Sequence, residues 1–170
     1  MTPSGRKATV IPAACIGDLS IESTLNITPP IRLAQEGDVA EIARLCEVLG
    51  YPVFPEDMAA RVSSLLNSER HWIAVAGGHE TALLGWVAAE HRLLLESGER
   101  VEIVGLVVDP AARRKGIGNA LVSGAEHWAS SRGVSTVFVR SNIARTESHD
   151  FYDRIGYERT KTQHAYTKIL

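Results

Sequence analysis

Apolar residues recur at helical spacing in four parts of the chain, which the sequence therefore predicts to be helices. The first helix follows Asp38, an expected N-cap, and ends before Gly50. The second begins near Pro55, the third spans 116–132 before Gly133, and the fourth spans Arg145–Ile155. Their apolar faces consist, in order, of Val39, Ile42, Cys46 and Leu49; of Met58, Val62 and Leu65; of Leu121, Ala125, Trp128 and Ala129; and of Phe151 and Ile155.

Six further segments are rich in apolar residues, are bounded by turn signals, and are predicted as strands. They are Ile31–Ala34, His71–Ala76, Thr81–His91, Val101–Val108, Ser135–Arg140 and Tyr157–Ile169. Residues 77–80 supply a hairpin turn between the second and third strands, and Asp109-Pro110 stops the fourth. The resulting order β-α-α-β-β-β-α-β-α-β predicts an α/β protein that has a mixed sheet with helices on both faces.

Length and composition indicate one domain of ordinary globular type. The chain has 170 residues, 45% of them apolar and 22% charged, and a net charge of −2. This balance gives no overall basic field for nucleic acid or an anionic membrane, and no run approaches the roughly 20 apolar residues of a membrane span. Residues 1–30 are expected to be a flexible leader, and residues 31–170 the folded domain.

The cysteines and histidines do not indicate a metal site. Cys15 and Cys46 form no Cys-x-x-Cys motif, and no two of the six histidines have metal-ligand spacing. We therefore expect two reduced thiols in a cytoplasmic protein, with neither a bound metal nor a disulfide.

A basic turn between a strand and a helix has the chemistry of a phosphate site. It lies in the segment Leu106-Val-Val-Asp-Pro-Ala-Ala-Arg-Arg-Lys-Gly-Ile-Gly118. A helix N-terminus offers unpaired N–H groups, and Gly116 and Gly118 allow an anion to approach the backbone closely. Arg113, Arg114 and Lys115 add positive charge. The pattern favours a diphosphate ligand, and the other interpretation is a solvated basic turn whose glycines only permit the bend.

Two other nucleotide-binding motifs fit this turn poorly. The P-loop pattern Gly-x-x-x-x-Gly-Lys-Ser/Thr is absent. A dinucleotide fingerprint needs a third glycine where Leu121 stands, and it should follow the strand directly. An NADP-binding interpretation would depend on Gly116 and Arg140 alone.

Taken together, these motifs resemble those of the GNAT superfamily of acetyltransferases. Arg113-Arg-Lys-Gly-Ile-Gly118 is similar to the family hallmark Arg/Gln-x-x-Gly-x-Gly/Ala, and the stretch from Ser141-Asn142 through Tyr152 to Gly156-Tyr157 is similar to its second motif. The resemblance covers about residues 31–170 and is greatest to a bacterial subgroup that includes aminoalkylphosphonate N-acetyltransferases. It implies a mixed, mainly antiparallel sheet of about six to seven strands flanked by about four helices.

The resemblance also implies roles for individual residues. The turn Arg113, Arg114, Lys115, Gly116, Ile117 and Gly118 should bind the CoA diphosphate. The strand Leu106, Val107 and Val108 should pair with the pantetheine arm, which Asn142 should also contact. Tyr152 should stand near the acetyl sulfur, where its phenol can act as general acid toward the departing thiolate.

The general base is less clearly indicated. Glu102 is the first candidate because relatives carry an acidic residue at that place in the strand. The subgroup often has a further Glu where this chain has Gly105, a departure that makes a water relay the substitute for direct base catalysis. His149 is a second candidate, although a role in ordering the helix or the substrate mouth fits it better.

The implied function is acetyl-CoA-dependent N-acetylation of a primary amine on a small molecule, by direct transfer in a ternary complex. The alternative is a non-catalytic acyl-CoA-binding or regulatory module. A covalent route fits poorly because Cys46 lies in the first helix and Cys15 in the leader. The terminal strand would offer an edge for a homodimer, and nothing in the sequence identifies the acceptor.

Overall fold

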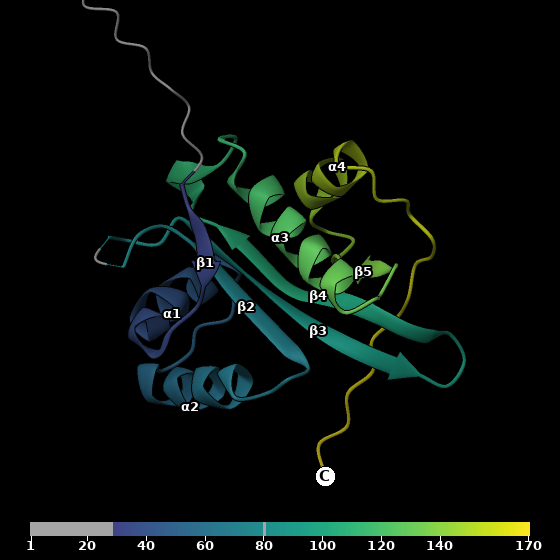
Figure 1. The fold of residues 1–170 in the computed structure, drawn as a ribbon, viewed down its shortest axis with the longest axis horizontal. Coiled ribbons are helices and arrows are strands. Elements are labelled where there is room, and N and C mark those ends of the chain that lie inside the picture. The colour runs from purple at the N-terminus through teal and green to yellow at the C-terminus, as the bar shows by residue number, and fades with distance from the viewer. Residues whose placement is uncertain (1–28, 80) are drawn as a thin grey trace, which may run out of the picture.

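The computed structural model describes residues 29–79 and 81–170. These residues form one β-sheet with α-helices packed beside it (Figure 1). The strands are β1 (Ile31–Leu33), β2 (His71–Ala76), β3 (Gly85–Leu94), β4 (Gly98–Val108) and β5 (Val137–Val139). The α-helices are α1 (Val39–Val48), α2 (Pro55–Leu66), α3 (Ile117–Ser131) and α4 (Thr146–Arg154), and the short 3-10 helices are η1 (Glu36–Asp38) and η2 (Pro110–Ala112).

The strands follow the order β1-β2-β3-β4-β5 across the sheet. Neighbouring strands are antiparallel except β4 and β5, which run parallel. Strand β4 carries one residue more than its partner β3, so that Val104 forms a β-bulge. Because a bulge shifts the alternation of side chains by one position, Val101 and Ile103 before it and Leu106 and Val108 after it all pack against the α3 layer.

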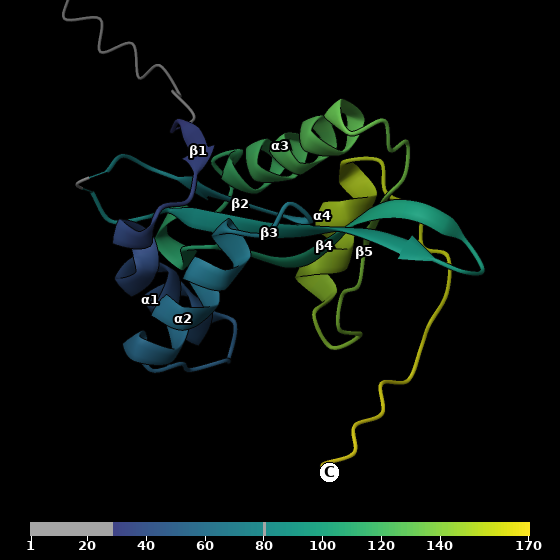
Figure 2. The same ribbon diagram turned by 60° about the horizontal axis from the view of Figure 1, so that its bottom comes forward.

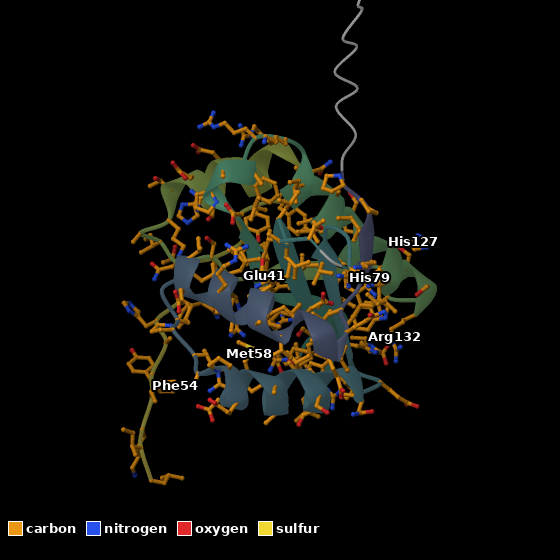
Figure 3. All side chains as sticks on the ribbon, turned by 90° about the vertical axis from the view of Figure 1, so that its left-hand side faces the viewer. Glu41, Phe54, Met58, His79, His127 and Arg132 are labelled. Atoms are coloured by element: carbon orange, nitrogen blue, oxygen red, sulfur yellow. The ribbon has the colours of Figure 1, made fainter. Side chains whose placement is uncertain are left out.

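Apolar layers cover the two faces of the sheet. Helix α3 lies on one face, and α1 and α2 lie on the other (Figure 2). The α3 layer buries Leu121, Val122, Ala125 and Ala129, and the α1/α2 layer buries Ile42, Leu45, Met58 and Val62. Figure 3 shows Met58 between α1 and α2, whereas Phe54, just before α2, lies at the outer edge and is 75% exposed.

All four predicted helices are present, and Asp38 occupies the predicted N-cap position of α1 without forming a cap hydrogen bond. Its carboxylate accepts two hydrogen bonds from Arg32, both of 2.7 Å, and one of 2.8 Å from the N–H of Gln35. The guanidinium of Arg32 holds the pKa of this carboxyl below its usual range. Asp38 therefore fixes β1 to the start of the helical layer.

The predicted strand Thr81–His91 begins later and ends later, as β3. At Leu83, just before β3, side chains of α1 bind the backbone in place of a neighbouring strand. The N–H of Leu83 donates to Glu41, and the carbonyl of Leu83 accepts from Arg44, each at 2.9 Å.

The predicted last strand, Tyr157–Ile169, is absent, so the residues that the structure describes form a sheet of five strands rather than six or seven. Residues 158–170 are all exposed and contain few apolar side chains, so that they have no face to bury. Tyr157 packs instead against Tyr152 and donates a 3.0 Å hydrogen bond to Glu126. The homodimer was predicted from the exposed edge of this last strand. Without that strand the argument for it is lost, and the homodimer stays a prediction.

Most of the predicted leader, together with Cys15, lies outside the described residues. Within residues 29–79 and 81–170, no helix has both the length and the apolar character that a membrane span requires.

Candidate active site

The basic turn connects η2 to the N-terminus of α3. Arg113, Arg114, Lys115 and Gly116 are exposed, and α3 begins at Ile117. Gly116 has a φ of 80° and Arg114 a φ of 62°, both in the left-handed region that favours glycine. This conformation presents the first N–H groups of α3 and three cationic side chains to solvent, an arrangement that suits a phosphate ligand.

Contacts between the turn and α4 bring two predicted parts of the site together. A Cβ on Gly118 would lie 3.3 Å from two ring atoms of Phe151 on α4, so glycine here permits close packing as well as anion approach. Arg113 also approaches Glu147 of α4 at 3.7 Å. The turn therefore lies beside the helix that carries Tyr152.

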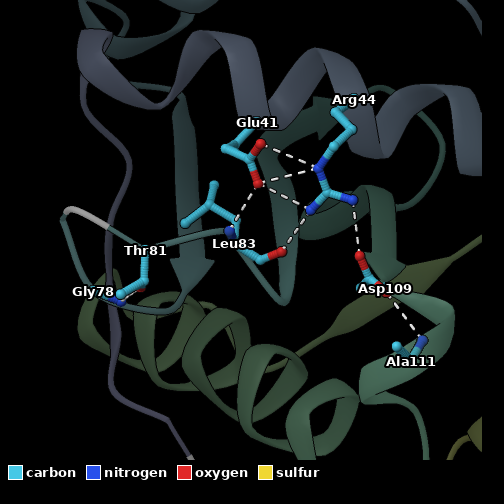
Figure 4. Close-up of polar contacts among 7 residues, drawn as sticks. All are labelled: Glu41, Arg44, Gly78, Thr81, Leu83, Asp109 and Ala111. Atoms are coloured by element: carbon cyan, nitrogen blue, oxygen red, sulfur yellow. Dashed lines mark hydrogen bonds and ion pairs between the residues drawn. The ribbon is translucent and has the colours of Figure 1, made fainter.

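An ion-pair network fixes the entrance to the turn (Figure 4). Arg44 of α1 donates to Glu41 at 2.9–3.1 Å and to Asp109 at 2.8 Å. Asp109 directly follows β4 and caps η2 by accepting a 3.0 Å hydrogen bond from the N–H of Ala111. The hydrogen bonds from Arg44 lower the pKa of both carboxyls, which keeps the network charged. Through Arg44, helix α1 thus fixes Asp109, which caps the short helix that leads into the basic turn.

A cleft opens where β4 and β5 separate. Their parallel pairing covers only three residue pairs and ends at Ile103 and Val139, next to the bulge at Val104. The cleft has a volume of about 180 Å³. It is lined by Leu49, Tyr51, Ile103, Val104, Gly105, Leu106, Val139, Arg140, Ser141, Asn142, Arg145, Ser148 and Tyr152. Beyond Ile103, the edge of β4 that faces the cleft has no strand partner among the described residues, so its backbone groups can bind an extended ligand.

Tyr152 lines this cleft from α4 and is held by other aromatic rings. Its ring makes edge contacts with Phe151 at 5.1 Å and with Tyr157 at 5.5 Å between centroids. Burial raises the pKa of Tyr152 to about 12. The phenol therefore stays protonated at neutral pH and can donate a hydrogen bond to an atom in the cleft.

Asn142 and His149 organise the far wall of the cleft. The side-chain oxygen of Asn142 accepts a 2.9 Å hydrogen bond from the N–H of Ala144, and its main-chain carbonyl lies 3.0 Å from Nε2 of His149. The amide nitrogen of Asn142 has no hydrogen-bond partner within residues 29–79 and 81–170 and can therefore donate to a ligand. His149 orders this loop, which agrees better with the ordering role considered for it than with a role as base.

Glu102 is almost fully buried on β4, where three arginines surround its carboxylate. Arg92 and Arg100 each donate to it at 2.9 Å, and Arg140 forms a further ion pair with it. Burial raises the pKa of Glu102, but these partners outweigh that effect and the net shift is downward. A low pKa makes a carboxylate a weak base, and Glu102 is not among the residues lining the cleft. Its predicted role as base stays a prediction, and its surroundings favour a positioning role.

Gly105 is explained by its packing. A Cβ at this position would lie 2.6 and 2.8 Å from Cζ3 and Cη2 of Trp86, whose indole is 8% exposed. The ring occupies the volume that a larger side chain would need. A glutamate at this position would therefore force the indole of Trp86 to move.

The matches to known proteins agree with this geometry. The sequence profile of the Acetyltransferase (GNAT) family matches residues 38–157. The chain belongs to the GNAT family.

Individual relatives extend this result. The chain is 31% identical over 134 residues to the aminoalkylphosphonate N-acetyltransferase of Salmonella typhimurium (strain LT2), a match that covers 75% of this chain and 82% of that protein. It is 33% identical over 78 residues to the uncharacterized N-acetyltransferase YhdJ of Bacillus subtilis (strain 168), which covers 45% of this chain and about half, 55%, of that protein. The solved structure of AAC(6')-Iy with the bisubstrate analog CoA-S-monomethyl-acetylneamine has the same fold, with a TM-score of 0.74 at 19% identity over 83% of this chain and 98% of that one.

As a GNAT protein, the chain is an N-acetyltransferase that uses acetyl-CoA as co-substrate. Its own geometry fits that substrate: the glycine turn at the α3 N-terminus suits a diphosphate, and the unpaired edge of β4 suits the amide-containing arm.

Several residues of the site could not be assigned from the sequence. Arg44 and Glu41 have the i, i+3 spacing of a helical ion pair, which was a usable signal. The ion pair of Arg44 with Asp109 and the position of Trp86 over Gly105 depend on contacts between elements that are distant in the sequence. Such contacts produce no local sequence pattern.

Proposed function

We propose that this chain acetylates the primary amine of a small molecule by direct transfer while acetyl-CoA and the acceptor are bound together. The observation that carries the proposal is the cleft between β4 and β5, because it places an unpaired strand edge, Asn142 and the protonated phenol of Tyr152 around one space. The aminoalkylphosphonate N-acetyltransferase relative is named for an amine acceptor, which supports an acceptor of this class.

Each part of the site has a defined task in this proposal. The N-terminus of α3 and the side chains of Arg113, Arg114 and Lys115 bind the diphosphate. The backbone of Leu106, Val107 and Val108 and the amide of Asn142 align the pantetheine arm. This fixed alignment supplies much of the rate enhancement because it makes the attack effectively intramolecular.

In the chemical step, the nitrogen lone pair of the neutral amine attacks the thioester carbonyl carbon, and the C–S bond breaks as the amide forms. Tyr152 donates its hydrogen bond, and then its proton, to the departing sulfur. Water in the cleft carries the proton released by the amine back to the phenolate. The products are the acetamide and the free thiol of CoA, so that atoms and charge balance.

Direct transfer is favoured over an acetyl-cysteine intermediate. Cys46 is buried in α1, and burial raises the pKa of its thiol, which lowers the fraction of reactive thiolate.

The proposal is tested by mixing the purified chain with acetyl-CoA and a panel of primary amines and measuring thiol release. We expect turnover with at least one amine, and initial-rate patterns that intersect when both substrates are varied. Parallel patterns would indicate a covalent intermediate and contradict direct transfer. Failure of CoA to bind by calorimetry would refute the assignment of the turn and the cleft.

A further inference from the structure

A cluster of arginines lies on the sheet face next to the cleft. Val101 and Ile103 pack on the α3 side, so Glu102 between them points to the opposite face. Helices α1 and α2 cover that face only toward β1 and leave the other end of β3 and β4 uncovered by helices (Figure 2). Arg92 and Arg100 are cross-strand partners in this uncovered region.

The cluster contains more positive charge than its carboxylates neutralise. Arg92, Arg100 and Arg140 all pair with Glu102, and Arg92 also lies 3.7 Å from Glu90. Three cations against two carboxylates leave one positive charge. Arg145, which lines the same cleft and donates to the carbonyl of Leu49 at 2.7 Å, adds a second.

Hydrogen-bonding capacity is also left over. A guanidinium has five N–H donors, whereas one carboxylate can accept only about four hydrogen bonds from all its partners. The Nε atom of Arg100 is buried without a hydrogen-bond partner among the described residues. Arg140 is 61% exposed and lines the cleft, so the N–H donors that do not contact Glu102 are accessible to a ligand there.

We infer that the acceptor is an amine that also carries an acidic group, a carboxylate or a phosphonate, which binds Arg140 at the edge of the arginine cluster. The inference rests on the proposed function and specifies its acceptor. Guanidinium groups bind such anions through paired, charge-assisted hydrogen bonds. The buried carboxylate of Glu102 orients the three guanidiniums, and the surplus charge disfavours acceptors with a second cationic group.

The test compares acceptors that differ in charge and little in shape. Glycine, β-alanine and 2-aminoethylphosphonate are each paired with a neutral partner: glycinamide, β-alaninamide and 2-aminoethanol. We expect kcat/KM for at least one acid to exceed that of its partner by about tenfold or more, as a charge-assisted hydrogen bond would give. Equal rates, or faster acetylation of the neutral or dicationic amines such as 1,3-diaminopropane, would overturn the inference and leave the proposed function intact.

Variants connect the preference to the cluster. Arg140→Gln should raise KM for the preferred acid about tenfold, with a smaller change in kcat and a much smaller change in KM for acetyl-CoA. Arg132→Gln removes the same charge at the far end of α3, where Arg132 stacks over Trp128, and should change neither constant. Figure 3 labels Arg132 at that position. An acid preference that survives in Arg140→Gln would overturn the assignment.

A binding measurement decides the case in which no probe is acetylated. The same acids and neutral partners are titrated into the CoA-saturated protein by calorimetry. Tighter binding of an acid, lost in Arg140→Gln but kept in Arg132→Gln, supports the site independently of turnover. Absence of binding by all three acids overturns it.

Discussion

Replacing Gly105 with alanine should destabilise the fold by a magnitude that follows from one contact. The new Cβ would lie 2.6 Å from Cζ3 of Trp86, whereas carbon atoms pack at about 3.5 Å or more. The indole would therefore have to retreat by about 0.9 Å within the α1/α2 layer, where it is 8% exposed. Overpacking of this kind costs about 1–3 kcal/mol, and each kcal/mol lowers Tm by about 2–4 °C in a protein of this size.

Urea unfolding followed by far-UV circular dichroism measures the loss, and Gly37→Ala is the matched control. A Cβ at Gly37 would meet nothing within 4 Å, so this variant should unfold within about 0.5 kcal/mol of the parent protein. In a Trp86→Phe background, which removes the two ring atoms involved, Gly105→Ala should cost much less. If Gly105→Ala is as stable as Gly37→Ala, or if its cost is the same in both backgrounds, the packing explanation for the missing carboxylate is wrong.

Three further predictions concern the turn, the phenol and the buried carboxylate. Gly116→Val should abolish CoA binding measured by calorimetry. The control Gly133→Val introduces similar backbone strain, at a φ of 76° beyond the C-terminus of α3, and should bind CoA normally. Equal CoA affinities of the two variants would make the turn purely structural. Tyr152→Phe should lower kcat about 10²–10⁴-fold with little change in CoA affinity, and wild-type turnover would rule out the phenol as the acid. The pKa of Glu102 is lowered, so its charged form stabilises the fold at pH above 4.5, the ordinary pKa of a glutamate, and Tm should fall as the pH drops below that value. We expect a smaller fall of Tm in Glu102→Gln. An identical dependence of Tm on pH in the variant would contradict the ion-pair assignment.

The helices and the basic turn could be predicted because their signals are local. The apolar spacing from Leu121 to Ala129 specifies a helix, and the glycines at 116 and 118 specify a turn, whatever other elements pack against them. The last strand was wrong because a strand needs a partner and an apolar face, and residues 158–170 have neither.

The site was predictable in outline and not in its electrostatics. Tyr152 and Asn142 were predicted as site residues through the resemblance, and the structure brings both to one cleft. The environment of Glu102 depends on arginines of β3 and β4 and on Arg140, just after β5, so it follows from the strand order and not from any spacing along the chain. The fit of Trp86 over Gly105 likewise depends on the register of β3 and β4, which the bulge at Val104 sets.

The brevity of the β4–β5 pairing has a consequence for how the native protein opens. Only three parallel residue pairs join β5 to the sheet, whereas β3 and β4 share a long antiparallel ladder. Amide protons of β5 and α4 should therefore exchange with solvent through local opening at a lower free energy than those of β3. A ligand that bridges the two strands would bind only the closed form and would slow this exchange in proportion to its occupancy. The segment that carries Tyr152 would then gain its rigidity from acetyl-CoA itself.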